Sequence, residues 1–307
     1  MKIDYYHNKE IELTENFFNL KEILNFQLEL DLKDKTFFFS FLCGGKIKKI
    51  KNMIEINKNY NESNLETMAR MPDNFIDLTV TSPPYDNLRQ YKGYSFDFEN
   101  VAKELFRVTK QGGVVVWVVG DATIKGSETG TSFRQALYFK EIGFNLHDTM
   151  IYRKLNPIPL THNRYEQEFE YMFVFSKGKP NTFNPIKIPT KRGGKKYNPK
   201  RPRDYDNHSI RHNRSEVLTY KMEKIKGNIF EYIVGAGNDK TNHSATFPEE
   251  LTNDHIVSWS NEGDLVYDPF MGSGTTAKMS ILNNRNWVGS EISSEYCKII
   301  EERVKKA

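Results

Sequence analysis

From residue 75 to the C-terminus, short apolar runs alternate with longer segments whose apolar residues recur at helical spacing. The run Val114–Val119 (VVVWVV) is apolar on both faces, which is typical of a parallel strand covered by helices on both sides. The expected strands are Phe75–Thr81, Val114–Val119, Leu146–Arg153, Glu170–Ser176, Asp264–Tyr267 and Trp287–Gly289; the expected helices are Phe98–Thr109, Ser132–Ile142, Pro248–Trp259, one from Thr275 and one to the C-terminus. Strands that alternate with helices predict a doubly wound α/β sheet.

Proline and glycine mark where these elements end. Pro83 and Pro84 cannot continue a central strand, so the chain turns after Thr81. The segment Gln111-Gly112-Gly113 is expected to close the first helix. Residues 1–52 stand apart because they are rich in Lys, Phe and Asn, and they are predicted to form one or two helices, such as Thr14–Leu30. They are either an appended helical element or a segment that precedes an alternative start at Met53.

Composition narrows the class of protein. The chain has 307 residues, of which 38% are hydrophobic and 27% charged, and this suits one large globular domain with an inserted or appended module. Its longest apolar run, Phe37–Cys43, is far shorter than the roughly 20 residues that cross a bilayer. Cys43 and Cys297 are the only cysteines, which is too few for a disulfide framework or a zinc site. The histidines are scattered, so no metal site is expected. A cytoplasmic protein without a membrane partner is favoured.

Positive charge is concentrated in one segment. Lys177–Lys226 holds fifteen Lys or Arg against four Asp or Glu, a net charge of +11, whereas the whole chain carries only +4. The segment has little apolar periodicity, so it is expected to contain loops and short strands or helices. A basic surface suits the phosphates of a nucleic acid, although a charge run by itself is more often a solvated loop.

A glycine-rich segment, Asp268-Pro269-Phe270-Met271-Gly272-Ser273-Gly274-Thr275-Thr276, lies between an expected strand and an expected helix. Glycines let a ligand approach the backbone closely, and the helix that follows offers N–H groups. Glu291 comes 23 residues after Asp268, near the spacing of roughly 20 at which an acid reaches a ribose hydroxyl in Rossmann-type sites. A Walker loop is excluded because no Gly-Lys-Ser/Thr follows. Taken alone, such a turn can equally be a tight connection.

A second motif, Ser82-Pro83-Pro84-Tyr85, follows the first expected strand. The prolines fix the backbone, so the Ser82 hydroxyl and the Pro83 carbonyl can point the same way as hydrogen-bond acceptors. The exocyclic amino group of a nucleobase supplies two donors that match them, and Tyr85 offers a face on which an unstacked base can lie. An isolated Pro-Pro pair would more often be a proline-terminated strand.

Together the two motifs closely resemble those of DNA amino-methyltransferases that use S-adenosylmethionine. The order, with the catalytic motif first, the cofactor motif last and a basic segment between them, resembles the β class, a circularly permuted version of the fold. The resemblance covers about five-sixths of the chain, from Met53 onward, and further matches are Leu65, Pro72-Asp73, Asp77-Leu78 and His243–Pro248. It implies a Rossmann-like methyltransferase sheet with a catalytic half (53–176), an inserted basic target-recognition region (177–240) and a cofactor-binding half (241–307), after an extension (1–52) of unknown role.

The resemblance also implies roles for individual residues. The flipped base would be held by Ser82, Pro83, Pro84 and Tyr85. The cofactor S-adenosylmethionine would be bound by Asp268, Pro269, Phe270, Gly272, Ser273, Gly274 and Thr275, with Thr246, Phe247 and Pro248 closing the pocket and Glu291 on the ribose hydroxyls. Ser63 stands where the family usually has an acid that binds the cofactor's adenine, so reduced cofactor affinity is expected. DNA would be contacted by Arg89, Tyr91, Lys92, Lys191, Arg192, Lys195, Lys196, Lys200, Arg201 and Arg203.

The reaction that the resemblance implies is direct methyl transfer without a covalent enzyme intermediate, because the sulfonium donor is already activated and the protein mainly aligns the reacting atoms. Methylation of cytosine C5 is excluded, since neither cysteine lies next to a proline. A serine at the first motif position favours cytosine N4, and adenine N6 stays open. An RNA methyltransferase and a DNA-binding protein that has lost methyl transfer are the more remote alternatives. Double-stranded DNA is the expected partner, whereas a homodimer and a cognate restriction endonuclease are left open.

Overall fold

The computed structural model of the chain describes residues 54–84, 96–157, 163–197, 217–233 and 247–307, and the backbone of five strands within the first 49 residues. These N-terminal strands form two small antiparallel sheets: β1 (Lys2–Tyr5) with β2 (Lys9–Glu12), and β3 (Phe26–Asp31) with β4 (Thr36–Cys43) and β5 (Lys46–Lys49). The helix predicted over Thr14–Leu30 is therefore wrong for its last residues. Phe26, Leu28 and Leu30 alternate with polar residues, and this period of two favours a strand.

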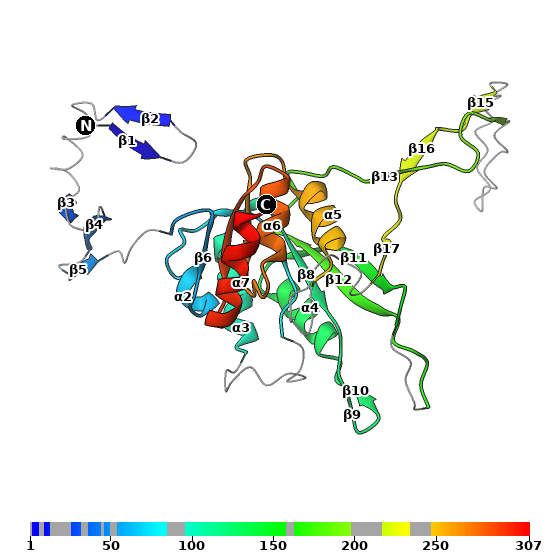
Figure 1. The fold of residues 1–307 in the computed structure, drawn as a ribbon, viewed down its shortest axis with the longest axis horizontal. Coiled ribbons are helices and arrows are strands. Elements are labelled where there is room, and N and C mark those ends of the chain that lie inside the picture. Colours follow the sequence, from blue (N-terminus) through cyan, green and yellow to red (C-terminus); the bar gives the residue numbers. More distant parts are fainter. Residues whose placement is uncertain are drawn as a thin grey trace, which may run out of the picture.

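An eight-stranded sheet forms the centre of the molecule (Figure 1). Its strands in spatial order are β17 (Ile229–Tyr232), β11 (Asn145–Lys154), β12 (Phe169–Ser176), β8 (Thr109–Val119), β7 (Ile76–Thr81), β18 (Leu265–Asp268), β19 (Asn286–Ser290) and β6 (Lys58–Tyr60). All neighbouring pairs are parallel except those of β12, which is antiparallel to β8 and β11. Each of the six strands expected from the sequence is present.

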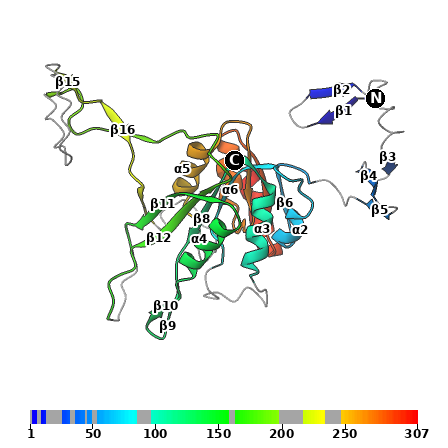
Figure 2. The ribbon, with the colours of Figure 1, turned by 180° about the vertical axis from the view of Figure 1, so that it is seen from behind.

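Helices cover both faces of this sheet, as Figures 1 and 2 show from opposite sides. One hydrophobic core holds residues of α2 (Asn64–Met68), α3 (Phe98–Val108) and α4 (Thr131–Glu141), and a second holds residues of α5 (Glu249–Trp259) and α6 (Thr275–Leu282). The last helix, α7 (Ser294–Lys305), packs against α6 through Ile300 and Ala277. Along β8, Val115 and Trp117 enter the first core while Val114 and Val116 enter the second. The doubly wound α/β fold is thus confirmed. None of the helices among the described residues is long and apolar enough to cross a membrane.

The junction between α3 and β8 differs from the prediction. The helix ends at Val108, and Gln111-Gly112-Gly113 lies inside β8 instead of in a separate turn. The register of its pairing with β7 shifts between Ile76–Thr109 and Leu78–Val114, so the intervening residues of β8 form a bulge. The bulge retains a backbone partner, because the N–H of Gly112 donates to the carbonyl of Lys177 at 2.6 Å.

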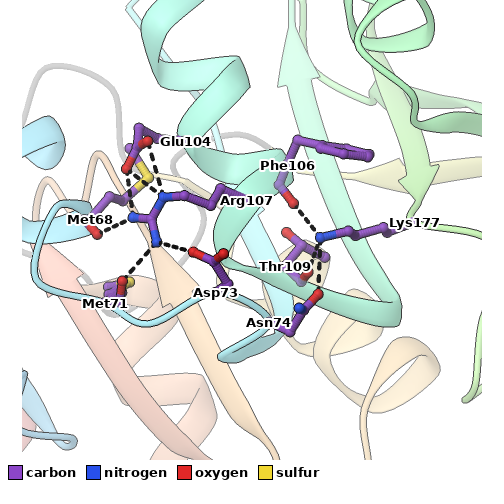
Figure 3. A network of polar contacts seen from close by, with 9 residues as sticks. All are labelled: Met68, Met71, Asp73, Asn74, Glu104, Phe106, Arg107, Thr109 and Lys177. Carbon is purple, nitrogen blue, oxygen red and sulfur yellow. Dashed lines mark hydrogen bonds and ion pairs between the residues drawn. The ribbon is translucent and has the colours of Figure 1, made fainter. Parts of the chain in front are cut away.

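Two basic side chains fasten α3 to the segments around it (Figure 3). Arg107 donates to the carbonyls of Met68 (2.6 Å) and Met71 (2.8 Å) and pairs with Asp73 and Glu104. Lys177 donates from Nζ to the carbonyl oxygens of Phe106 (2.7 Å) and Thr109 (3.0 Å) at the C-terminal end of α3, and to Asn74 Oδ1. The first cation of the basic segment therefore stabilises the end of a helix.

The described residues of the basic segment beyond Lys177 form an extended ribbon, which leaves the sheet after β12 and leads back to it at β17 (Figure 1). Two antiparallel pairs build it, β13 (Lys187–Pro189) with β16 (Glu223–Ile225) and β14 (Lys196–Tyr197) with β15 (Leu218–Thr219). A separate small hairpin, β9 (Thr123–Ile124) with β10 (Ser127–Glu128), follows β8. The expectation of loops and short strands in the basic segment is confirmed for the residues described.

Candidate functional site

Four neighbouring parallel strands end at the same edge of the sheet. They are β6, β19, β18 and β7, and the segments that follow them are 61–64, 291–293, 269–274 and 82–84. Ligands of open α/β sheets bind beyond the carboxyl ends of the strands, where side chains from several connections converge. Both motifs singled out in the sequence therefore lie at one edge, although they are far apart along the chain.

A direct hydrogen bond joins the two motifs. The hydroxyl of Thr81, the last residue of β7, donates to Asp268 Oδ1 at 2.6 Å, and the two residues are 187 positions apart. The same carboxylate accepts from the N–H of Phe270 (3.0 Å) and from the hydroxyl of Thr276 (2.7 Å). Asp268 is only 4% exposed; burial raises its pKa, and these three hydrogen bonds oppose that rise. Both of its oxygens are thus engaged in shaping the edge.

Hydrogen bonds from backbone N–H groups hold the glycine-rich loop (269–274) in place. The N–H of Met271 donates to the carbonyl of Ser290 (3.0 Å), and the N–H of Gly272 donates to Glu291 Oε2 (2.8 Å). Gly274 begins α6 with φ +86°, and a Cβ placed there would lie 3.1 Å from Ile300 Cγ1 of α7. Position 274 therefore requires glycine because of its positive φ and the approach of α7. The approach of a ligand, which the sequence suggested, stays a prediction.

The Glu291 side chain links two of these connections, 269–274 and its own. Besides accepting from Gly272, it accepts from the N–H of Ser293 at 2.8 Å through Oε1. It is 9% exposed, and burial raises its pKa, with the charge of Asp268 acting in the same direction and the backbone hydrogen bonds opposing both. A carboxylate can accept about four hydrogen bonds, so Glu291 can accept further hydrogen bonds from a ligand.

The segment after β6 lies against the other two connections. Asn61 Nδ2 donates to the carbonyls of Glu291 (2.9 Å) and Ile292 (3.0 Å), and the buried Asn64 donates to the carbonyl of Pro269 (3.3 Å). Ser63, the residue before α2, is half-buried between these two anchors. The neighbouring Glu62 is already engaged, because its carboxylate accepts from Thr67 (2.7 Å) and pairs with Arg70.

Aromatic and apolar residues border the glycine-rich loop. Phe270 is half-buried and contacts Phe96 (ring centroids 5.3 Å apart) and Trp117 (6.3 Å). Phe247 packs against the second core, and Pro248 directly precedes α5. Thr246 lies outside the described residues. Phe270 and Phe247 therefore belong to different faces of the sheet, one on each side of the edge.

Several residues of the candidate catalytic motif are described. Ser82 is half-buried, Pro83 is buried and Pro84 is half-buried, and all three follow the end of β7. Tyr85 lies outside the described residues, as do Arg89, Tyr91 and Lys92.

Cys297, on α7, is half-buried, and burial raises the pKa of its thiol. A raised pKa keeps the thiol protonated, which makes it a poor nucleophile.

The candidate DNA-binding residues of the ribbon are exposed at its turn. Lys191, Arg192, Lys195 and Lys196 are all exposed. The turn is closed by the bond from the Gly193 N–H to the Thr190 carbonyl (2.9 Å), and the Gly194 N–H donates to the Tyr220 carbonyl (3.0 Å) on the other side of the ribbon. Lys200, Arg201 and Arg203 lie outside the described residues. Because β12 is antiparallel to β7 and β8, the ribbon starts at the opposite edge of the sheet from Ser82.

Some residues that build the site had no role in the sequence prediction. Arg303 of α7 is one of them, and it donates to the hydroxyls of the buried Ser273 (2.7 Å) and Thr275 (3.2 Å). Thr81 and Asn64 likewise act through tertiary hydrogen bonds. Thr81 had a sequence signal in its position next to the Ser-Pro-Pro-Tyr motif, and Asn64 had one in its position next to Ser63, whereas Arg303 had none.

Comparison with known proteins gives one consistent family. The family model described as DNA methylase, of the N6/N4 type, matches residues 76–302. Orphan methyltransferase M.BamHII of Bacillus amyloliquefaciens is 58% identical over 242 residues, which are 75% of this chain and 89% of that protein. Among solved structures, the cytosine-N4-specific PvuII DNA methyltransferase aligns with a TM-score of 0.61 at 20% identity, covering 82% of this chain and 87% of the other. The M1.HpyAVI–SAM complex aligns with a TM-score of 0.52 at 21% identity, covering 80% and 98%.

Proposed function

The chain belongs to the N6/N4 DNA methylase family, and from this premise we propose that it transfers the methyl group of S-adenosylmethionine to N4 of cytosine in double-stranded DNA. The observation that carries the proposal is the hydrogen bond between Thr81 and Asp268. It keeps the end of β7, where Ser82 and Pro83 follow, beside the start of the glycine-rich loop. A methyl donor bound at the loop and an acceptor base bound at Ser82 would then be neighbours.

The residues at the carboxyl edge suit S-adenosylmethionine. The carboxylate of Glu291 has acceptor positions left for ribose hydroxyls, at the position where Rossmann-type sites place an acid. Asp268 and Glu291 are both buried carboxylates, and the charge of Asp268 is one cause of the raised pKa of Glu291. A cationic ligand reduces such repulsion. When bound, S-adenosylmethionine supplies a methyl group that its positively charged sulfur activates for transfer.

In this proposal, the chain's own residues hold the acceptor. The Ser82 hydroxyl and the Pro83 carbonyl accept hydrogen bonds from the two N–H groups of the amino group. They so stabilise the positive charge that develops on the nitrogen when it attacks the methyl group. Tyr85 stacks on the base, which has been flipped out of the duplex. The rigid backbone of Pro83 and Pro84 keeps both acceptors in place before the base arrives.

The remaining parts of the chain are assigned to DNA binding and to the two halves of the catalytic domain. We assign the basic ribbon, with the exposed Lys191, Arg192, Lys195 and Lys196, to the target-recognition region (177–240). The catalytic half (53–176) and the cofactor-binding half (241–307) supply β7 and β18, which pair in the centre of the sheet. Ser63 is the expected weak point of the cofactor site, since a hydroxyl replaces an acid there.

The test is to incubate the purified protein with unmethylated bacterial DNA and labelled S-adenosylmethionine, digest the DNA to nucleosides and identify the product by mass spectrometry. We expect N4-methylcytosine. N6-methyladenine would retain the family and overturn the base assignment. If the cofactor binds in calorimetry but no DNA nucleoside is methylated, the substrate is not DNA, and RNA is the next to try. The variant Tyr85→Ala serves as the control, because it should lose methylation and keep cofactor binding.

A further inference from the structure

Arg303, near the end of α7, contacts three atoms where the glycine-rich loop enters α6. Its Nη1 donates to the carbonyl of Ser273 (2.9 Å), to the hydroxyl of Ser273 (2.7 Å) and to the hydroxyl of Thr275 (3.2 Å). Its side chain is 10% exposed, so these bonds are shielded from water. Charged donors make the stronger hydrogen bonds in proteins. The guanidinium therefore holds the stretch of the loop that enters α6.

The same guanidinium also contacts the first residue of α5. Nη2 of Arg303 pairs with Glu249 Oε1 at 2.7 Å, and Lys278 of α6 pairs with the same oxygen at 2.6 Å. Burial alone would raise the pKa of Glu249, but the hydrogen bonds and charges of Lys278 and Arg303 outweigh it and lower the pKa. Glu249 is the first residue of α5 and directly follows Phe247-Pro248. One side chain thus ties the glycine-rich loop to the start of α5.

We propose that Arg303 is a positioning residue for the cofactor, which sets the distance between the glycine-rich loop and the Phe247-Pro248 segment without touching the ligand. The proposal rests on the assignment of this edge to S-adenosylmethionine. It adds the C-terminal helix to the parts of the chain on which cofactor affinity depends.

Among the charged side chains that hold the loop, Arg303 differs from Asp268 and Glu291. Asp268 and Glu291 bond the N–H groups of Phe270 and Gly272, and both are also candidate ligand residues. Removing either would alter the loop and the ligand site together. Arg303 contacts only Ser273 of the loop and Thr275 at the start of α6, so its removal loosens the end of the loop while the two carboxylates keep their hydrogen bonds. A change in cofactor affinity can then be attributed to positioning.

The experiment compares Arg303→Ala and Arg303→Lys with the control Lys305→Ala, which removes a cation from an exposed position of the same helix. Calorimetry gives the dissociation constant for S-adenosylmethionine, filter binding gives that for DNA, and steady-state kinetics gives kcat and KM. Arg303→Ala should weaken cofactor binding on the order of tenfold, which corresponds to about 1.4 kcal/mol. DNA affinity and kcat at saturating cofactor should change little, because the chemical groups at Ser82 are untouched.

The variants Arg303→Lys and Lys305→Ala serve as the conservative substitution and the control. Lysine keeps the charge but offers a single ammonium in place of the planar fork, so Arg303→Lys should lie between the wild type and Arg303→Ala. Lys305→Ala should match the wild type. A parallel loss of kcat, DNA affinity and cofactor affinity in Arg303→Ala would mean that Arg303 only supports the fold, and would overturn the proposal. Unchanged cofactor affinity would overturn it as well.

Two further results keep the proposal separate from its premise. If the wild type does not bind S-adenosylmethionine, the proposed function fails, and this is seen before any variant is measured. If Arg303→Ala does not fold, Glu249→Gln replaces it, because this change keeps an acceptor at the same position and removes only the charge that pairs with Arg303. The same charge also pairs with Lys278, so Lys278→Met is measured beside this variant and should bind the cofactor like the wild type. Glu249→Gln should weaken cofactor binding and leave DNA binding unchanged; a cofactor affinity equal to the wild type would overturn the proposal.

Discussion

Two threonines of β7 allow a matched test of the bond between the motifs. Thr81 and Thr79 are both fully buried, at 0% exposure. Thr81 donates to Asp268 at 2.6 Å, whereas the hydroxyl of Thr79 has no hydrogen-bond partner among the described residues. Valine has nearly the shape of threonine, so each Thr→Val change removes a hydroxyl and leaves the packing volume nearly unchanged.

The two substitutions should have different effects on the free energy of unfolding. A hydrogen bond to a charged group contributes about 1.5–3 kcal/mol, and the buried carboxylate left behind by Thr81→Val loses one of its three donors. We therefore expect Thr81→Val to destabilise the protein by about 1.5–3 kcal/mol. Thr79→Val removes an unpaired buried hydroxyl, so it should be neutral or stabilising.

Urea denaturation of both variants measures the difference, and pH supplies a second check. Burial already raises the pKa of Asp268, and losing the Thr81 donor should raise it further. A protonated Asp268 tolerates the loss better than an ionised one, so the deficit of Thr81→Val should shrink as the pH falls through that pKa. Equal effects of the two substitutions would refute the role assigned to the Thr81–Asp268 bond, as would a deficit that grows at low pH.

Three further predictions follow from other parts of the structure. Because burial raises the pKa of Glu291, cofactor affinity measured by calorimetry should fall as the pH is lowered through that pKa, and Glu291→Gln should abolish this dependence; in the ligand-free protein the same raised pKa contributes stability at low pH that is lost as the pH rises through it. Reversing Lys195 and Lys196 to Glu should weaken DNA binding and reduce the slope of log K against log salt by about 0.9 for each phosphate that the ribbon no longer neutralises, and an unchanged slope would count against the ribbon. Arg107→Met should destabilise the protein by about 1–3 kcal/mol in urea denaturation, because it removes the donors to Met68 and Met71, while Lys103→Met on the exposed side of α3 should have almost no effect.

Six strands of the central sheet could be predicted, most clearly those that are apolar on both faces. Val114–Val119 illustrates this, since its residues alternate between the two cores. The short strands β6 and β17 at its two sides were not predicted, because three or four residues with exposed positions give little apolar signal. The bulge at Gln111-Gly112-Gly113 could not be foreseen, because it depends on a backbone bond to Lys177 from another strand. The N-terminal strand β3 is not predicted by composition, which favours a helix there; its signal is the period-two alternation of Phe26, Leu28 and Leu30.

The candidate site was predictable where its chemistry lies in short motifs and unpredictable where it depends on tertiary contacts. Ser82-Pro83-Pro84 and the glycine-rich loop are contiguous in sequence, and each follows a strand. Arg303 gave no signal, since a basic residue in the last turn of an amphipathic helix is ordinarily a surface charge that complements the helix dipole. The glycine at 274 was expected from its motif, whereas the approach of Ile300, which also requires glycine there, could not be foreseen because it comes from a helix later in the chain.

The pairing of β7 with β18 also has a consequence for how the protein is made. Thr81 and Asp268 are 187 residues apart, whereas Tyr267 and Ser290, on the next pair of strands, are 23 apart. Closing the longer loop costs about 2 kcal/mol more in chain entropy, at roughly 0.6 kcal/mol for each doubling of length. A ribosome adding about 5–20 residues per second needs about 10–40 s to make the intervening chain. During that time the apolar β7, with Leu78 and Val80, can pair with β8 on one side but lacks β18 on the other, so the nascent protein has an unpaired strand that is open to pairing with other chains.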